Sequence, residues 1–260
     1  MLLAMDVGNS NIKFGLFDGE LLKASWRVGS DSKKTADEYG VILTDLFKSK
    51  NLKLSEVDGA ILSSVIPSLN YTLTHMVEYY IGKRPLVVGN GIKTGLNIKY
   101  ENPREVGSDR IINSVAAMKK YGGNLIVVDF GTATTFNVIT EKGEFLGGAI
   151  APGIKLSVDS LASNCVKLPK IELQMPKSVI GKNTVTNMQS GIVYGYIGLL
   201  EKIIKQIKTE TRFDNAKVIV TGGLSEVVVN HTDVVDVVDR RLSLNGLRII
   251  YDMNKSEAAQ

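Results

Sequence analysis

The sequence predicts an α/β protein that contains two copies of one folding unit. Short apolar runs bounded by Gly, Asn, Asp or Pro alternate with segments of helical spacing, which is typical of α/β proteins. A strand that runs into an Asp-x-Gly turn, followed by a second strand and a glycine turn, occurs at Asp6 and again at Asp129, about half the chain apart. With 260 residues, of which 44% are apolar, the chain is long enough to bury a large core.

In the first half of the chain, the sequence predicts two helices, each with a strand before it and a strand after it. Apolar runs that stop at turn residues predict the strands, which lie at residues 2–5, 12–17, 59–65 and 85–88. Apolar residues at helical spacing predict helices at 35–49 and 69–81. Tyr39, Ile42, Leu43 and Leu46 share one face of the first helix, and Gly82 ends the second.

The second half opens in the same way as the first. Helical spacing predicts helices at 111–121 and 188–208, the first of them stopped by Gly122 and Gly123. The predicted strands lie at 125–128, 136–139 and 217–220. A glycine pair, Gly222 and Gly223, follows the last of these strands. We therefore expect two domains, 1–117 and 118–260, that pack around a cleft.

Composition and charge argue against several classes of protein. The net charge of +4 comes from 31 basic and 27 acidic residues spread along the chain, so we expect no nucleic-acid partner. A single cysteine, Cys165, excludes an internal disulfide and a cysteine-rich zinc site. No apolar run approaches the ~20 residues of a membrane span, and Asp6 interrupts the apolar N-terminus. We expect a cytoplasmic protein with no membrane partner.

The two Asp-x-Gly turns have the chemistry of a phosphate site. Glycine lets the backbone approach a ligand, and successive N–H groups in such a turn form a concave anion site. Asn9, Ser10, Thr132 and Thr134 add amide and hydroxyl donors, and the two aspartates are able to hold a cation beside a polyphosphate. Either turn alone is more often ordinary hairpin chemistry. Two copies, together with the glycine pair after a third strand, favour the phosphate interpretation.

These three elements resemble the phosphate-1, phosphate-2 and adenosine motifs of the actin-like, sugar-kinase and Hsp70 ATPase superfamily. Five motifs over nearly the whole chain narrow the resemblance to type III pantothenate kinases. They are Asp6-Val-Gly-Asn-Ser-Asn11, Glu101-Asn-Pro-Arg-Glu-Val-Gly-Ser-Asp-Arg110, Asp129-Phe-Gly-Thr-Ala-Thr134, Gly147-Gly-Ala-Ile-Ala-Pro-Gly153 and Gly181-Lys-Asn-Thr184. Ser10 and Ser108 stand where the family more often has Thr and Ala. The resemblance implies duplicated actin-like (ribonuclease H-like) domains with a central mixed sheet and an ATP cleft between them.

The resemblance also implies an activity. It is the transfer of the γ-phosphoryl group of ATP to pantothenate, which yields 4′-phosphopantothenate in the first step of coenzyme A biosynthesis. The implied cofactors are Mg²⁺ with ATP, and K⁺ or NH₄⁺ as a monovalent cation at Asp129. The implied assembly is a homodimer in which the partner subunit closes the substrate site. The residues matched to ATP contacts are Asp6, Val7, Gly8, Asn9, Ser10, Asn11, Ile12, Lys13 and Thr132, and those matched to pantothenate contacts are Tyr100, Gly107, Ser108, Asp109, Arg110 and Thr184.

Asp109 opens the helix predicted at 111–121 and allows two interpretations. An acidic residue in the first turn commonly stabilises the N-terminus of a helix. The resemblance implies instead that Asp109 is the general base for the pantothenate hydroxyl.

Two other functions stay open at this point. Some relatives of the family are described as transcriptional activators, so a catalytically weak regulatory or transcription-associated protein of the same fold is one alternative. Such a protein would need a concentrated basic surface or a helix-turn-helix, and the sequence has neither. An actin-like filament or chaperone ATPase is the other, although a chain of 260 residues lacks the insertions that those proteins usually carry.

Overall fold

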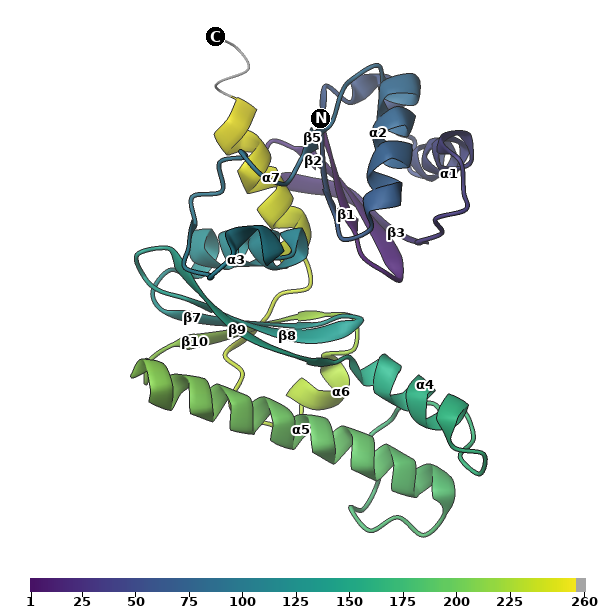
Figure 1. Cartoon of the computed structure of the whole chain (residues 1–260). Coiled ribbons are helices and arrows are strands. Elements are labelled where there is room, and N and C mark those ends of the chain that lie inside the picture. The colour runs from purple at the N-terminus through teal and green to yellow at the C-terminus, as the bar shows by residue number, and fades with distance from the viewer. Residues whose placement is uncertain (256–260) are drawn as a thin grey trace. The chain divides into compact units, whose positions relative to one another are not determined.

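The computed structural model describes residues 1–255, which form two compact units (Figure 1). Unit 1 contains residues 1–96, 102–116 and 241–255, and unit 2 contains residues 97–101 and 117–240. The sequence division at 117/118 therefore lies one residue from a point where the chain passes between the units. Residues 241–255, which that division assigns to the second half, pack in unit 1 because their apolar face is buried there.

Unit 1 is built on a five-stranded mixed sheet. Its strands are β1 (Leu2–Val7), β2 (Asn11–Asp18), β3 (Leu21–Gly29), β4 (Gly59–Ser64) and β5 (Leu86–Val87), in the order β3-β2-β1-β4-β5. β1 and β2 form an antiparallel hairpin, as do β2 and β3. β4 lies parallel to β1 and β5 parallel to β4. The mixed sheet agrees with the fold class that the sequence predicts.

Two helices of unit 1 have an end with clear capping chemistry. They are α1 (Ala36–Lys48), α2 (Pro67–Ile81), the first part of α3 (Ser108–Tyr121), and α7 (Leu242–Lys255), with short 3₁₀ turns at Leu54–Glu56 and Pro103–Glu105. Thr35 and Glu38 form a capping box at the start of α1. Gly82 ends α2 in the left-handed conformation, with φ of 72°.

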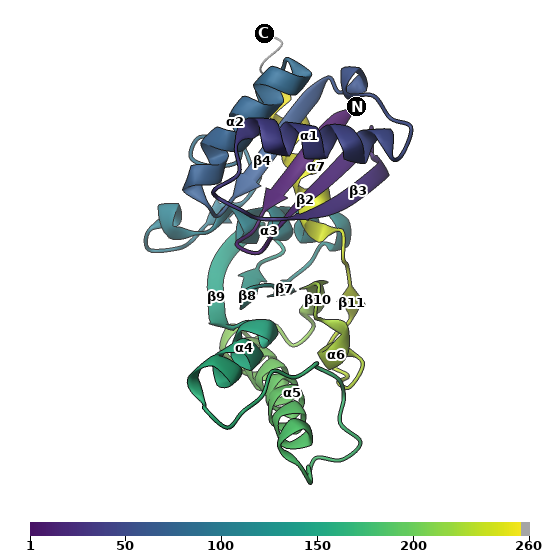
Figure 2. The ribbon, with the colours of Figure 1, turned by 90° about the vertical axis from the view of Figure 1, so that its right-hand side faces the viewer.

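The two faces of this sheet are covered by different helices. Side chains alternate along β1, so that Leu3, Met5 and Val7 face α1 and α2, whereas Leu2 and Ala4 face α7 and the start of α3. Figure 2 shows α1 and α2 in front of this sheet and α7 behind it. The same alternation puts Asp6 on the face that α7 and α3 cover, and this positions the site described below.

Unit 2 repeats the strand order of unit 1 with one strand added. Its strands are β6 (Asn97–Ile98), β7 (Leu125–Phe130), β8 (Ala133–Ile139), β9 (Glu144–Pro152), β10 (Lys217–Gly222) and β11 (Val237–Val238), in the order β11-β10-β7-β8-β9-β6. β7 and β8 form the antiparallel hairpin that corresponds to β1 and β2, and β10 lies parallel to β7 as β4 does to β1. This correspondence confirms the internal duplication.

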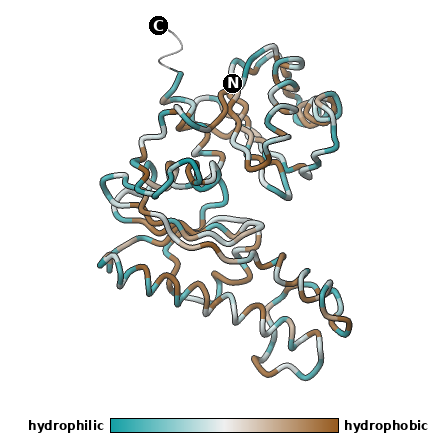
Figure 3. The backbone as a smooth tube through the Cα atoms, in the orientation of Figure 1, coloured by the Kyte–Doolittle hydropathy of each residue, from teal (hydrophilic) through white to brown (hydrophobic). Residues whose placement is uncertain are grey.

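The helices of unit 2 are α4 (Ile154–Asn164), the long α5 (Thr184–Thr211) and the short α6 (Glu226–Val229). Along α5 hydrophobic and hydrophilic residues alternate (Figure 3), and its apolar stripe packs on the sheet face that contains Ile126 and Val128. Asp129 lies between Val128 and Phe130, so its side chain points to the opposite face of that sheet. Within residues 1–255, no helix combines the length and the apolar character needed to cross a membrane.

Candidate active site

The Asp6 turn connects β1 to β2 and is braced by a residue from the end of β3. The Gly8 N–H donates to the Asn11 carbonyl oxygen at 3.0 Å. Ser30 holds the turn from outside, because its hydroxyl donates to the Gly8 carbonyl at 2.6 Å and its N–H donates to the Ser10 carbonyl at 3.1 Å. Asn9, Ser10 and Asn11 are exposed. The turn therefore presents backbone and side-chain donors to solvent in a fixed conformation.

The neighbours of this turn differ in which of their groups are accessible. Val7 and Ile12 are buried in the core of unit 1, so their side chains support the turn and are not available to a ligand. Asp6 is also buried, with 7% of the residue exposed. Lys13 lies opposite Asp6 in the hairpin register, and its Nζ is 3.0 Å from Asp6 Oδ2. The carboxylate of this turn thus has a cationic partner within the same hairpin.

The start of α3 is fastened to the end of β4. Ser63, which is the register partner of Asp6 on β4, donates from its hydroxyl to Ser108 Oγ at 2.9 Å. Ser108 Oγ in turn donates to the Ser64 carbonyl at 3.2 Å. These two bonds hold the first turn of α3, and with it Asp109, at the edge of the sheet where β1 and β4 end.

Asp109 has an altered proton affinity. Burial raises the pKa of its carboxyl above the ordinary value, and the negative charge of Asp6 raises it further. The Arg110 N–H, which donates to Asp109 Oδ1 at 2.9 Å, lowers the pKa, but burial outweighs this bond. A carboxyl whose pKa is raised in this way binds a proton more readily than a solvated aspartate does.

Gly107 leaves room for the Asp109 carboxylate. A Cβ atom at Gly107 would lie 2.5 Å from Asp109 Oδ1, closer than atoms of this kind can approach. The carbonyl of Gly107 also accepts the Arg110 N–H at 3.1 Å. Arg110 itself is buried, with 6% of the residue exposed. The four residues Gly107 to Arg110 therefore form one compact segment in which a side chain at the first position would displace the acid.

The Asp129 turn connects β7 to β8 and is held by a glycine from the end of β9. The Gly131 N–H donates to the Ala133 carbonyl at 3.1 Å, and the Gly153 N–H donates to the Thr132 carbonyl at 3.0 Å. A Cβ atom at Gly153 would overlap the carbonyl oxygens of Gly131 and Thr132, so only glycine permits this approach. Thr132 is exposed at this turn.

Hydroxyl groups surround the place of Asp129 in the sheet. Its register partners are Thr135 on β8 and Thr221 on β10, and both threonines are buried. A carboxylate beside two hydroxyls is a set of oxygen ligands, which hard cations prefer. Thr134, for which the sequence predicts a role as a phosphate donor, is fully buried, so that prediction is wrong: its hydroxyl is not available at the surface of the turn.

Tyr100 and Thr184 belong to unit 2. The Tyr100 ring packs against Phe145, with 6.4 Å between the ring centroids, and beside Gly147, where a Cβ atom would lie 3.3 Å from the ring. Thr184 is the exposed first residue of α5, directly after the cap residue Asn183, whose side chain accepts the Thr186 N–H. The Tyr100 ring is therefore placed by its packing, whereas Thr184 is placed by the capped start of α5.

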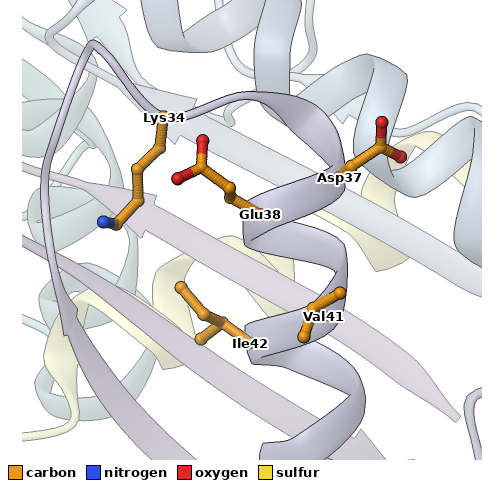
Figure 4. A pocket seen from close by; sticks show the side chains of 5 residues that line it. All are labelled: Lys34, Asp37, Glu38, Val41 and Ile42. Carbon is orange, nitrogen blue, oxygen red and sulfur yellow. The ribbon is translucent and has the colours of Figure 1, made fainter.

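Three serines that the sequence does not mark as site residues lie near Asp6 in the structure. Ser30, Ser63 and Ser243 all contact the Asp6 region, through the bonds described above and through a contact of Ser243 with Lys13. Ser63 lies near the end of the strand predicted at 59–65, which is a weak sequence signal for a site residue. Nothing in the local sequence marks Ser243 as one. A surface hollow beside α1 contains no predicted site residue; Figure 4 shows its lining side chains Lys34, Asp37, Glu38, Val41 and Ile42.

Comparison with known proteins gives matches over nearly the whole chain. A family model described as type III pantothenate kinase matches residues 2–206. A protein named type III pantothenate kinase from Moorella thermoacetica is 54% identical over 254 residues, which cover 98% of this chain and 100% of the relative.

Two solved structures show the fold at low sequence identity. A Baf family protein described as a transcriptional activator, from Campylobacter jejuni, has a TM-score of 0.63 at 20% identity, over 98% of this chain and 99% of that one. A ROK family glucokinase from Streptomyces griseus, in complex with glucose and AMPPNP, has a TM-score of 0.51 at 12% identity, over 98% and 99%. At these identities the likeness concerns the fold alone.

Proposed function

This chain belongs to the type III pantothenate kinase family, and we propose that the residues around Asp6, Asp109 and Asp129 divide the reaction between them. The reaction is the ATP-dependent phosphorylation of pantothenate in coenzyme A biosynthesis. The observation that carries the proposal is the half-buried Asp109, whose pKa is raised and which is held at the end of β1 and β4 beside the Asp6 turn.

Asp109 acts as the general base in this proposal. The primary hydroxyl oxygen of pantothenate forms a bond to the γ-phosphorus of ATP while the bond to the ADP oxygen breaks. The hydroxyl proton passes to the Asp109 carboxylate, so that charge and atoms balance. The raised pKa favours this transfer, because a base accepts a proton more effectively as its pKa approaches the working pH.

Pantothenate binding is assigned to the segment from Gly107 to Arg110, together with Tyr100 and Thr184. The buried guanidinium of Arg110 suits the carboxylate of pantothenate, because arginine pairs with carboxylates through two parallel hydrogen bonds. The bonds from Ser63 and Ser108 support this assignment, because they fix the segment against β4. Positioning of the acceptor hydroxyl is a large part of what phosphoryl transfer requires.

ATP binding is assigned to residues 6–13 and to Thr132. The accessible donors of the Asp6 turn and the Lys13 ammonium are suited to phosphate oxygens. The chain also fits the implied cations. Mg²⁺ is commonly held by one or two carboxylates and substrate phosphates, which suits the aspartate of either turn. Asp129 with the hydroxyls of Thr135 and Thr221 suits K⁺ or NH₄⁺. When bound, such cations offset the charge of the polyphosphate.

We also propose a homodimer formed through unit 2. Several large apolar side chains of this unit are exposed between β9 and the first half of α5, among them Ile150, Val166, Val179 and Ile180. A unit with many large exposed apolar side chains commonly has a surface that another protein covers. Thr184 lies close in sequence to this set, which supports a substrate site that the partner subunit completes. A protein that sediments as a monomer and yet phosphorylates pantothenate at full rate would contradict the proposal.

The direct test compares ATP turnover with and without pantothenate. We expect pantothenate to stimulate ADP release and 4′-phosphopantothenate to appear in equal amount, as measured by mass spectrometry. The name of the Campylobacter jejuni relative makes DNA binding the matched control. Salt-dependent DNA binding without pantothenate-stimulated turnover would favour the regulatory alternative instead.

A further inference from the structure

Ser243 lies beside Lys13, although 230 residues separate the two in the chain. Lys13 Nζ donates to Ser243 Oγ at 3.3 Å, and the same nitrogen is 3.0 Å from Asp6 Oδ2. Ser243 is buried, with 4% of the residue exposed, in the first turn of α7. The ammonium of Lys13 is thus held by two acceptors from two different parts of the chain.

The helix that carries Ser243 is fixed in its place. Its apolar residues Leu244, Leu247 and Ile250 are buried in the same core as Leu2 and Ala4 of β1. A Cβ atom at Gly246 would overlap the backbone of Ile112, so α7 and α3 pack at their closest approach there. The packing of α7 therefore fixes the position of Ser243 as a hydrogen-bond acceptor for Lys13.

The duplication gives this position a counterpart. α3 is the first α-helix after β5, the last strand of the first copy, although β6 and a 3₁₀ turn lie between them, and α7 follows β11, the last strand of the second copy. Asp109 is the second residue of α3, and Ser243 is the second residue of α7. Each residue interacts with one member of the Asp6–Lys13 pair: the charge of Asp6 raises the pKa of Asp109, and Ser243 accepts a hydrogen bond from Lys13.

We propose that Ser243 is a positioning residue, which orients the Lys13 ammonium for the phosphates of ATP. This inference rests on the proposed assignment of Lys13 to ATP. A lysine side chain has four rotatable bonds, and ordering it on ligand binding costs entropy. A hydroxyl acceptor holds the ammonium in place without cancelling its charge, as a second carboxylate would. The ligand then meets a cation that is already oriented.

The test compares Ser243→Ala and Ser243→Val with Ser243→Thr. Threonine keeps the hydroxyl, whereas valine has the same shape without it. We expect the alanine and valine variants to raise the KM for ATP by about 3- to 10-fold, the worth of one hydrogen bond. The threonine variant should restore the KM for ATP to within about twofold of the wild-type value. The KM for pantothenate should stay unchanged in all three variants, and calorimetric binding of a non-hydrolysable ATP analogue should follow the KM for ATP.

The same substitutions in a Lys13→Met background test the role of Ser243 separately from the assignment of Lys13 to ATP binding. If Ser243 acts through Lys13, Ser243→Ala should have no further effect on nucleotide binding once Lys13 is replaced. Ser243→Ala effects that are equal in both backgrounds, or a loss of thermal stability with an unchanged KM for ATP, would overturn the inference. If Lys13→Met itself leaves nucleotide binding unchanged, the assignment of Lys13 to ATP is wrong and the inference falls with it.

Discussion

Asp6 and Asp129 are each the second-to-last residue of the first strand of their hairpin, and each lies next to a hydroxyl residue on the neighbouring parallel strand, Ser63 in one unit and Thr221 in the other. On the antiparallel side the two units differ. The residue opposite Asp6 is Lys13, which forms an ion pair with it, whereas the residue opposite Asp129 is Thr135. Two copies of one hairpin thus surround the same acid with different charges.

This difference indicates that the two duplicated units have different chemical roles. Unit 1 has a cation of its own at the acid, and it adds Asp109, whose pKa is raised by burial. Unit 2 offers a carboxylate and hydroxyl oxygens at the corresponding place, a ligand set that suits a cation taken from solution. We therefore expect substitutions in unit 1 to change the chemical step, and substitutions around Asp129 to change the dependence on monovalent cations.

The largest effect should come from Asp109→Asn. Asparagine keeps the size of the side chain but is unable to accept the proton, so kcat should fall by ~10²- to 10⁴-fold, the usual contribution of a general base. Binding of ATP should be retained, because the two aspartate turns are unchanged. Single-turnover kinetics and calorimetry on the same variant measure both quantities. Near wild-type turnover would remove Asp109 from the mechanism.

The stability of that variant distinguishes the two interpretations of Asp109. A carboxyl with a raised pKa in the folded state contributes stability that is present below its unfolded-state pKa and is lost as the pH rises through the folded-state pKa. At neutral pH the ionised group therefore opposes folding, and Asp109→Asn should melt no lower than the wild type. A helix-stabilising charge would instead cost about 0.3–1 kcal/mol on removal.

Gly107→Ala should have the next largest effect. The new Cβ would displace the Asp109 carboxylate, and a misplacement on this scale commonly costs about 10²-fold in kcat. The matched control is Gly89→Ala, because a Cβ at Gly89 meets no atom within 4 Å. The control should keep wild-type kcat and KM values. Equal losses in both variants would point to a general disturbance of unit 1.

The cation dependence tests the second unit. We expect the wild-type rate to be low in Na⁺ and to rise with K⁺ at matched ionic strength. Asp129→Asn should abolish most of this rise. We expect the ratio of the rate in K⁺ to the rate in Na⁺ to fall by about 10-fold, which corresponds to about 1.4 kcal/mol. Equal wild-type rates in the two salts would contradict the assignment of the cation to Asp129.

Thr135→Lys would remove the difference between the two units directly. It places a lysine opposite Asp129, as Lys13 is opposite Asp6. We expect the variant to depend less on K⁺ than the wild type, because the acid then has a cation within the chain. Thr135→Val is the matched control, since it removes the hydroxyl and adds no charge. Melting temperatures show whether each variant is folded.

The smallest effect concerns pH and salt. Because the pKa of Asp109 is raised, kcat should fall with decreasing pH in a range above that of an ordinary aspartate. Burial is the largest cause of the shift and is not screened by salt. Raising the ionic strength should therefore move the pH at which kcat falls by much less than one pH unit. If the pH at which kcat falls moves strongly with salt, the charge of Asp6, and not burial, is the main cause of the raised pKa of Asp109.

Local structure follows closely from the sequence, because its causes are local. The helix predicted at 35–49 is α1 with its two cap residues, Thr35 and Ser49, and the stop predicted at Gly82 is the left-handed C-cap of α2. The duplicated Asp-x-Gly turns also appear as predicted, because glycine and the flanking apolar runs determine a hairpin by themselves. The edge strand β3 was not predicted, since it is held by pairing with β2 and has no buried apolar run of its own.

The sequence by itself determined the fold class, the duplication and the family, since these depend on periodicity and on motifs of a few residues. Only the tertiary structure decided which side chains meet. The apolar face of α7 predicts that this helix is buried but not against which sheet, and its packing with β1 brings Ser243 to Lys13. The raised pKa of Asp109 likewise depends on burial and on the charge of Asp6, which lies far away in the chain. Periodicity is a property of neighbouring residues, whereas burial and contact depend on all the elements that pack together.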